Sequence, residues 1–375
     1  MATSKRSKEH SRSGGGYTDL LQALAERERR VMDFLNRSGY AQAVRPQMMR
    51  SLVRSYVKRP AKRLRPALLL FCAGAAGGDE AVALPAAAAV ELFHTWTLVH
   101  DDIIDRDARR RGGPTLHVEA AERIAQEWQV SREQAGHFGM SAALLAGDVQ
   151  HGWAIRLLAS RETSASPSPE VLLALVRELE GPVLRRLVQG EVLDVELARR
   201  PLGQLRQREI LNMLRLKTGT LYEFSARAGA ALGLGTADLS HPLVEKLARF
   251  GLECGLAFQL QDDILGAVGD SGALGKPVGS DMREGKRTML VYYAYQAANP
   301  QQGRALRRNL GNPHATQAQV QQIANLFLEL GAVERTAALA RRIVSRALPL
   351  LRELPSAEHR NLLHLWARYL IDRTT

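Results

Sequence analysis

The sequence predicts an all-α fold in a single domain. Apolar residues make up 45% of the 375 residues and aromatic residues only 5%. Ala and Leu dominate the apolar set, and both favour helices over strands. Apolar residues also recur at the three- and four-residue spacing of a buried helix face along most of the chain. We expect no strand pair, no internal repeat and no linker between two cores, so one helical bundle is the simplest architecture.

The elements follow in order. Residues 1–16 are mostly Ser, Lys, Arg and Gly and predict a disordered basic tail, with a transit peptide as the weaker alternative. One domain is expected over residues 17–375. Apolar spacing predicts helices at 20–35, 51–57, 65–76, 80–107, 141–160, 171–198, 205–234, 241–268, 286–298, 317–330, 332–348 and 357–372. Gly, Pro and Ser predict loops or breaks at 110–114, 162–169, 235–240 and 269–285.

Composition also limits the class of partner. The formal net charge of +12 suits nucleic acid, a membrane surface or a small polyanion. Arg is spread along many segments without interleaved aromatic residues, which argues against a nucleic-acid partner. The longest apolar runs, 67–78 and 81–90, are too short to span a membrane. Cys72 and Cys254 lie in apolar surroundings and indicate free buried thiols in a reducing compartment, so we expect a cytoplasmic protein.

Two aspartate-rich segments are the strongest functional signal. Asp101, Asp102 and Asp105 form the first, and Asp262 and Asp263 form the second. Both follow apolar runs, where carboxylates are costly unless they are paired or bind metal. Residues four apart share a helix face, so Asp101 and Asp105 point the same way and Asp102 points to the side. Hard cations such as Mg²⁺ prefer oxygen ligands and phosphate, so these carboxylates predict a metal site. The alternative is a solvated acidic face, which would suit a more polar helix.

Basic residues accompany both acidic segments. The runs are 62–66, 109–115, 217–220, 275–277 and 285–288. Each run alone is typical of a solvated surface. Arg binds phosphate through paired hydrogen bonds and Lys binds it as a point charge. Together with two carboxylate clusters, these runs predict two diphosphate pockets, one occupied through metal ions and one bound directly by Arg and Lys.

In this order and spacing the segments resemble the trans-isoprenyl diphosphate synthases, or polyprenyl synthetases. The resemblance extends from residue 17 to the C-terminus and rests on residues 62–66, 94–115, 147–148, 190–194, 217–218 and 258–288. It implies a helical bundle of the isoprenoid synthase type with a central active-site cavity. The implied activity is a Mg²⁺-dependent prenyltransferase that condenses isopentenyl diphosphate with dimethylallyl, geranyl or farnesyl diphosphate. A homodimer with three Mg²⁺ ions per active site is also implied.

The resemblance implies roles for individual residues. The expected metal ligands are Asp101, Asp102, Asp105, Asp262 and Asp263. The expected allylic-site residues are Arg110, Lys217, Gln259 and Lys276, with Lys286 nearby. The expected isopentenyl diphosphate pocket is formed by Lys62, Arg65, His94 and Arg111. Catalytic roles fall to Lys217, Thr218 and Gln259, of which the last two would flank the developing carbocation. No nucleophile is assigned, because the departing diphosphate is the favoured proton acceptor in the family.

The chain departs from the family pattern at a few positions. Gly266 stands where a third aspartate is common, and Glu191 stands where glutamine is common. Product length in the family depends on the position five before Asp101, where large residues shorten the product. Trp96 occupies it, with Phe93 one turn earlier. These aromatics predict a short C20 or C15 product, such as geranylgeranyl or farnesyl diphosphate, with ordinary core packing as the alternative.

Other functions remain open at this point. A longer-chain polyprenyl diphosphate synthase would share every motif. A class I terpene cyclase would not need the isopentenyl diphosphate pocket, and a non-catalytic subunit of a heteromeric synthase would be expected to lose the first aspartate segment. A basic helical protein that binds nucleic acid leaves both aspartate segments unexplained.

Overall fold

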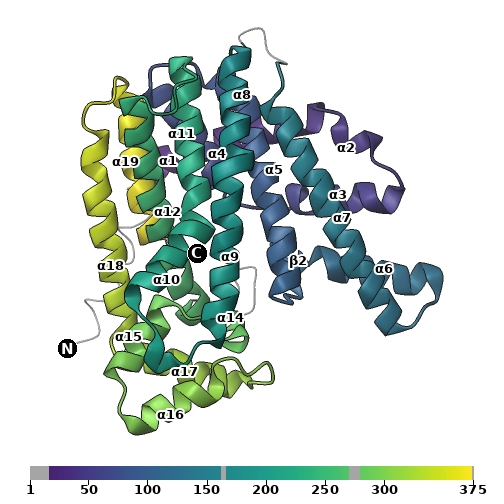
Figure 1. Cartoon of the computed structure of the whole chain (residues 1–375), viewed down its shortest axis with the longest axis vertical. Helices are drawn as coiled ribbons and strands as arrows, with labels where there is room; N and C mark the ends of the chain where they lie inside the picture. The colour runs from purple at the N-terminus through teal and green to yellow at the C-terminus, as the bar shows by residue number, and fades with distance from the viewer. Residues whose placement is uncertain (1–16, 162–165, 270–278, 374–375) are drawn as a thin grey trace.

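Helices form almost the whole of the computed structural model, which describes residues 17–161, 166–269 and 279–373 (Figure 1). The first half contains α1 (Thr18–Arg37), α2 (Tyr40–Ala43), α3 (Gln47–Lys58), α4 (Leu64–Ala75), α5 (Glu80–Ile104), β1 (Arg109–Arg110), β2 (Gly113–Pro114), α6 (Leu116–Trp128), α7 (Arg132–Leu158) and α8 (Pro169–Glu178). The all-α prediction is confirmed. The tail at 1–16 lies outside the described residues, and the single domain over 17–375 stays a prediction.

The described part of the second half is also helical. It contains the π-helix η2 (Leu179–Val183), α9 (Leu184–Arg199), the 3₁₀-helix η3 (Leu202–Gln204), α10 (Gln207–Leu214), the π-helix η4 (Arg215–Gly219), α11 (Thr220–Leu234), α12 (Pro242–Val268), α14 (Ser280–Glu284), α15 (Met289–Ala297), α16 (Pro300–Asn309), α17 (Gln317–Glu329), α18 (Ala332–Ala347), the 3₁₀-helix η5 (Leu348–Leu351) and α19 (Ala357–Asp372).

The core is built around α4, α5, α11 and α12. Helix α11 packs against both α4 and α12, while α5 packs between α4 and α7, and α18 covers α12. Fully buried aromatic residues fill the space between them, among them Phe71, Phe93, Tyr222, Phe250 and Trp366. Helices α4 and α11 approach closely, because a Cβ added at Gly229 of α11 would lie only 2.1 Å from the backbone oxygen of Leu69 in α4. This packing fixes the ends of α5 and α12, which carry the two aspartate segments.

Helix α5 begins and ends at identifiable signals. The Asp79 side chain accepts a hydrogen bond from the backbone N–H of Ala81 and caps the first turn, and Pro85 lies early enough to be tolerated. The expected helix 80–107 stops at Ile104, and Arg106 adopts a positive φ of 57°. Helix α5 is long and apolar enough to cross a membrane by length and composition alone, but 67% of its most apolar stretch is buried inside the protein, as in a core helix.

A short hairpin replaces the expected simple break at 110–114. Strands β1 and β2 pair antiparallel, with Arg110 opposite Gly113, so the expectation of no strand pair was wrong. Arg111 and Gly112 both have positive φ, 50° and 76°, which is the feature that two-residue type I′ turns require. The turn reverses the chain immediately after α5. It thereby returns Arg110 toward the aspartates that precede it.

Several helix boundaries differ from expectation. The helices expected at 171–198 and 205–234 are each interrupted by a π-helical turn, η2 and η4. Helix α15 begins after Thr288, whose side chain caps it, so Lys286 lies outside the helix. Helices α2, α6, α14 and α16 were missed, so the loop expected over 269–285 was wrong where α14 lies. The first part of α7 was also missed, and it begins with a capping box between Ser131 and Gln134. Helix α16 also begins with a capping box, between Asn299 and Gln302, so capping signals rather than apolar periodicity mark the starts of α7 and α16.

Candidate active site

A single large cavity collects most of the predicted functional residues. Its volume is about 1030 Å³, and its wall is formed by α5, α9, η4 and α12 with segments near α4 and α14. The predicted residues on its wall are Lys62, Arg65, His94, Trp96, Asp101, Arg110, Arg111, Lys217, Thr218, Gln259, Asp262, Asp263 and Lys286. Asp102, Asp105 and Phe93 lie behind or beside that wall. Lys276 lies outside the described residues.

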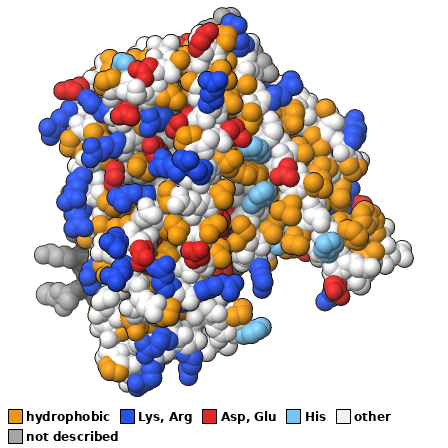
Figure 2. Space-filling model, viewed as in Figure 1, with side chains coloured by type: hydrophobic (Ala, Val, Ile, Leu, Met, Phe, Trp, Pro, Cys, Tyr) orange, Lys and Arg blue, Asp and Glu red, His pale blue; other side chains and the backbone are white. Residues whose placement is uncertain are grey.

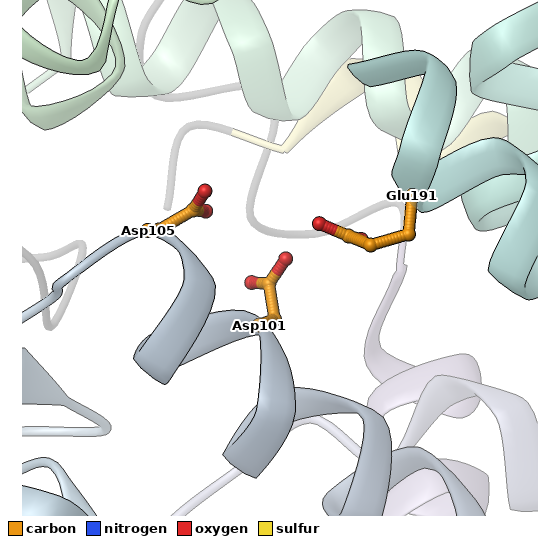
Figure 3. Close-up of side chains that lie close together, drawn as sticks. All are labelled: Asp101, Asp105 and Glu191. Atoms are coloured by element: carbon orange, nitrogen blue, oxygen red, sulfur yellow. The ribbon is translucent and has the colours of Figure 1, made fainter. Parts of the chain in front are cut away.

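The end of α5 presents two carboxylates to a third from α9. Asp101, Asp105 and Glu191 each place a carboxylate oxygen within 4.8 Å of the others. Figure 3 shows Asp101 and Asp105 on one helix, with Glu191 reaching toward them from the facing helix. The shared orientation of Asp101 and Asp105 follows from their four-residue spacing, as the sequence predicts. Three oxygens this close repel one another unless cations lie among them.

Two lysines supply positive charge to this cluster. The Lys217 Nζ lies 2.9 Å from Asp101 Oδ1, 2.9 Å from Glu191 Oε2 and 2.7 Å from Asp194 Oδ2. Lys286 Nζ pairs with Asp105. Burial alone would lower the pKa of Lys217, but the surrounding carboxylates outweigh it and raise that pKa well above its usual value. Both lysines therefore remain ammonium ions at neutral pH.

The close approach of α9 and η4 explains how Lys217 reaches the cluster. A Cβ added at Gly190 would lie only 2.3 Å from the backbone nitrogen of Lys217, so no larger residue fits at position 190. The π-helical turn η4 adds one residue to the helical repeat and redirects Lys217 and Thr218 toward the cavity. Residues 190–194 are among the segments on which the family resemblance rests. Nevertheless, neither Glu191 nor Asp194 had been assigned a role.

Asp102 has different surroundings from its neighbours. It is fully buried and accepts hydrogen bonds from the Tyr56 hydroxyl and from Arg110 Nε, the latter at 2.6 Å. Arg110 Nη2 also lies 3.2 Å from Asp101 Oδ2 and 3.0 Å from Asp107 Oδ2. The hairpin after α5 creates this arrangement by returning Arg110 to the helix end. In this structure Asp102 orients an arginine on the cavity wall and does not itself face the cavity.

The end of α12 is arranged differently. Asp262 is half-exposed and is bonded by Arg373 Nη2 at 2.8 Å. Asp263 is buried, and its Oδ1 accepts a hydrogen bond from Gln259 Nε2 at 2.9 Å, while its Oδ2 has no partner in the described part of the chain. Burial raises the pKa of Asp263 well above its usual value. The Thr218 hydroxyl donates to Gln259 Oε1 at 3.0 Å, so Thr218, Gln259 and Asp263 form one chain of hydrogen bonds.

Sequence reasoning missed an acidic residue beside α12. A Cβ added at Gly266 would lie 3.5 Å from Asp281 Oδ2, so the Asp281 carboxylate occupies space next to the position where the family often carries a third aspartate. Asp281 lies in the first turn of α14 and lines the cavity. The segment 269–285 had been treated as a Gly-rich loop with a single lysine. Its acidic residues Asp281 and Glu284 were the available signal.

Most of the remaining basic residues also line the cavity. Arg65 Nη1 lies 3.1 Å from His94 Nε2, and the Arg65 guanidinium stacks 4.3 Å from the Tyr222 ring centroid. Burial, reinforced by Arg65 and Arg111, holds the pKa of His94 well below its usual value, so His94 is neutral. Burial and Arg373 lower the pKa of Lys62 to about 8. These groups line the same cavity as Asp101, Lys217 and Lys286.

Aromatic side chains close another part of the cavity. Trp96 lines it, and its ring centroid lies 4.9 Å from that of Phe93, 5.4 Å from His100 and 4.8 Å from His151. His151 is held in turn by Glu180, with Nε2 3.0 Å from Oε1. Phe93 is fully buried and supports Trp96 from behind. The tryptophan therefore has few alternative positions to adopt.

Comparisons with known proteins agree with this geometry. The family model for polyprenyl synthetase matches residues 46–327. A geranylfarnesyl diphosphate synthase of Aeropyrum pernix is 35% identical over 354 residues, covering 92% of this chain and 98% of that protein. A geranylgeranyl pyrophosphate synthetase structure from Pyrococcus horikoshii Ot3 is 29% identical, with a TM-score of 0.77, and the match covers 95% of this chain and 99% of that one.

A further solved structure carries ligands. The geranylgeranyl pyrophosphate synthase from Corynebacterium glutamicum, complexed with isoprenyl diphosphate and magnesium, is 27% identical with a TM-score of 0.80 and covers 95% of this chain and 99% of that one. The family match spans well over half of the chain, and the cavity contains the paired acidic and basic groups that binding a diphosphate requires. The chain therefore belongs to the polyprenyl synthetase family and is an isoprenyl diphosphate synthase, a prenyltransferase.

Proposed function

We propose that the cavity condenses isopentenyl diphosphate with an allylic diphosphate to give a short-chain, all-trans prenyl diphosphate. One observation carries the assignment of the site. Acidic and basic side chains gather near the ends of α5 and α12 and at the middle of α9, while apolar residues such as Trp96 and Leu187 line the rest of the cavity. A charged diphosphate suits the first region and a hydrocarbon chain suits the second.

The acidic residues fit Mg²⁺ as the resident cation. Asp101, Asp105 and Glu191 offer hard oxygen donors within 4.8 Å of one another, and the buried Asp263 Oδ2 has no partner in the described ranges. We assign the ions to Asp101, Asp105, Asp262 and Asp263, with Asp102 acting through Arg110. When bound, Mg²⁺ would act as a Lewis acid on the leaving diphosphate. The expected number of three ions remains part of the proposal.

The chain's own residues would divide the remaining work. Lys217, Lys286 and Arg110 would neutralise the allylic diphosphate as its carbon–oxygen bond breaks, while Lys62, Arg65, His94 and Arg111 hold isopentenyl diphosphate. Thr218 and Gln259 would place oxygen dipoles beside the allylic cation, and the apolar wall would keep water from trapping it. The double bond of isopentenyl diphosphate then attacks the cation. The released diphosphate takes the proton that is lost.

Product length is proposed to depend on Trp96. The relatives are named for geranylfarnesyl and geranylgeranyl products, so we propose a C20 or C25 product in place of the C20 or C15 expected from sequence. Trp96 borders the cavity and is wedged among Phe93, His100 and His151. Trp96→Ala should lengthen the main product by one or more C5 units, and Trp96→Phe should shift it less. An unchanged product in both variants would remove Trp96 from this role.

A homodimer is also proposed. Several apolar residues of α7 and α9 remain exposed, among them Leu144, Leu145, Val188, Val192 and Val195, the most exposed being Leu145 at 56%. Figure 2 shows hydrophobic side chains gathered on this face of the molecule. Contiguous apolar surface of this kind favours a protein partner, and Val188 and Val192 also line the cavity. Leu145→Glu should give a monomer in size-exclusion chromatography with light scattering, whereas an unchanged mass would contradict this interface.

One assay tests the reaction. The protein would be mixed with Mg²⁺, isopentenyl diphosphate and, in turn, dimethylallyl, geranyl or farnesyl diphosphate, and the products identified by mass spectrometry. We expect consumption of at least one starter and a C20 or C25 product. Consumption of none would contradict the proposed function. The cytoplasmic location expected from sequence remains a prediction that cell fractionation would test.

A further inference from the structure

We propose that Glu191 is an additional ligand of the ion held by Asp101 and Asp105, supplied to the end of α5 by the facing helix α9. The inference rests on the proposed function and adds a residue to its metal site. Figure 3 shows its carboxylate facing those of Asp101 and Asp105.

The geometry is close to what one ion requires. Mg²⁺ binds oxygen at about 2.1 Å, so two ligands on opposite sides of the ion lie at most about 4.2 Å apart. One oxygen from each of Asp101, Asp105 and Glu191 lies within 4.8 Å of the others. A shift of less than about 1 Å would therefore bring all three onto one ion. Side-chain rotation alone supplies a movement of that size.

The contacts of Lys217 argue against a purely structural role for Glu191. Asp101 and Asp194 already lie 2.9 Å and 2.7 Å from the Lys217 ammonium, so this lysine keeps two carboxylate partners without Glu191. The other oxygen of Glu191, Oε1, is buried and has no hydrogen-bond partner in the described ranges of the chain. A buried carboxylate oxygen without a donor is costly. A bound cation would satisfy it, whereas the neutral amide of glutamine would bring no charge to the ion.

The test measures Mn²⁺ binding directly by electron paramagnetic resonance, with inorganic pyrophosphate present. Glu191→Gln keeps the size of the side chain and an oxygen that can accept from Lys217, so the fold should be retained. We expect its Mn²⁺ affinity to fall about tenfold, within the range reported for metal-site supporting groups. Glu196→Gln is the matched control, because Glu196 is exposed on the same helix and its loss changes the net charge equally. It should bind Mn²⁺ as the unaltered protein does.

The variant Asp101→Asn distinguishes a failure of the metal site itself from a failure of the role proposed for Glu191. If Asp101→Asn loses Mn²⁺ binding while Glu191→Gln binds normally, the metal site stands and the role of Glu191 is overturned. If neither variant differs from the unaltered protein, the metal site itself is wrong. A similar loss in Glu191→Gln and Glu196→Gln would show only a general effect of charge, and would also overturn the role of Glu191. A melting curve followed by circular dichroism would confirm that each variant is folded.

Discussion

The ends of α5 and α12 carry similar aspartate motifs but differ in what surrounds them. At α5, Asp101 and Asp105 face a third carboxylate and two lysines. At α12, Asp262 is half-exposed against Arg373, and Asp263 is buried against Gln259. The first end is thus a group of acids neutralised by two mostly buried lysine side chains. At the second end, Asp263 is held by the neutral amide of Gln259 and Asp262 by Arg373 near the C-terminus. Similar motifs can therefore contribute unequally to one site.

The largest expected effect is on turnover and distinguishes Asp101 from the adjacent Asp102. Asp101→Asn should lower kcat by about a thousandfold, because several kcal/mol of charge stabilisation at the leaving diphosphate would be lost. Its free energy of unfolding should change little, because the attraction of Asp101 to Lys217 and Arg110 is offset by repulsion from Asp105 and Glu191. Steady-state kinetics with saturating Mg²⁺ would measure the effect. Turnover within a few-fold of the unaltered protein would place the metal elsewhere.

Alkaline pH should affect the side of the cavity near α12. Burial and Arg373 lower the pKa of Lys62 to about 8, so Lys62 is charged below pH 8 and neutral above it. We expect kcat/KM for isopentenyl diphosphate to fall about tenfold per pH unit above 8, as the cation that binds its diphosphate is lost. In Lys62→Arg this fall should disappear, because arginine stays charged. Identical pH profiles for the two proteins would contradict the role of Lys62.

Asp102 should behave unlike Asp101 although the two are adjacent. Asp102→Asn weakens a buried network with Tyr56 and Arg110 and should reduce the free energy of unfolding by about 1–3 kcal/mol. Its effect on kcat should be smaller than that of Asp101→Asn. Urea unfolding of both variants measures the difference. Equal stabilities with equal losses of kcat would mean that Asp102 acts in the cavity as a metal ligand.

Much of this arrangement was predictable from sequence. The helical periodicity predicted the main core helices, and the spacing of Asp101 and Asp105 predicted their shared face. The hairpin at Arg111 could not be predicted, because arginine rarely adopts a positive φ. Only tertiary contacts hold the arginine in that conformation. The π-helical turns were missed because apolar periodicity does not register one inserted residue. Glu191 was missed because it reaches the cavity from α9, which is distant in sequence from α5. Asp281 was missed because it lies in a segment that was expected to be a Gly-rich loop.

The smallest expected effect concerns Gly266, which stands in the second aspartate segment where a third aspartate is common. Gly266→Ala places a methyl group 3.5 Å from Asp281 Oδ2, an ordinary contact, and removes glycine from the interior of α12. It should raise the free energy of unfolding by about 0.4–1 kcal/mol and leave turnover nearly unchanged. Gly266→Asp would instead place two carboxylates side by side, so its melting temperature should fall without Mg²⁺ and recover when Mg²⁺ and pyrophosphate are added. Stabilisation by Gly266→Asp in the absence of ions would contradict the placement of Asp281.

The central claim is that the two aspartate segments form one metal site, built mainly on the end of α5. Crystals grown with Mn²⁺ and pyrophosphate would test it through anomalous scattering. We predict at least one Mn²⁺ ion within about 2.5 Å of carboxylate oxygens of Asp101 and Asp105, and a further ion at Asp262. Manganese only at Asp262, or none within that distance of Asp101 and Asp105, would contradict the account.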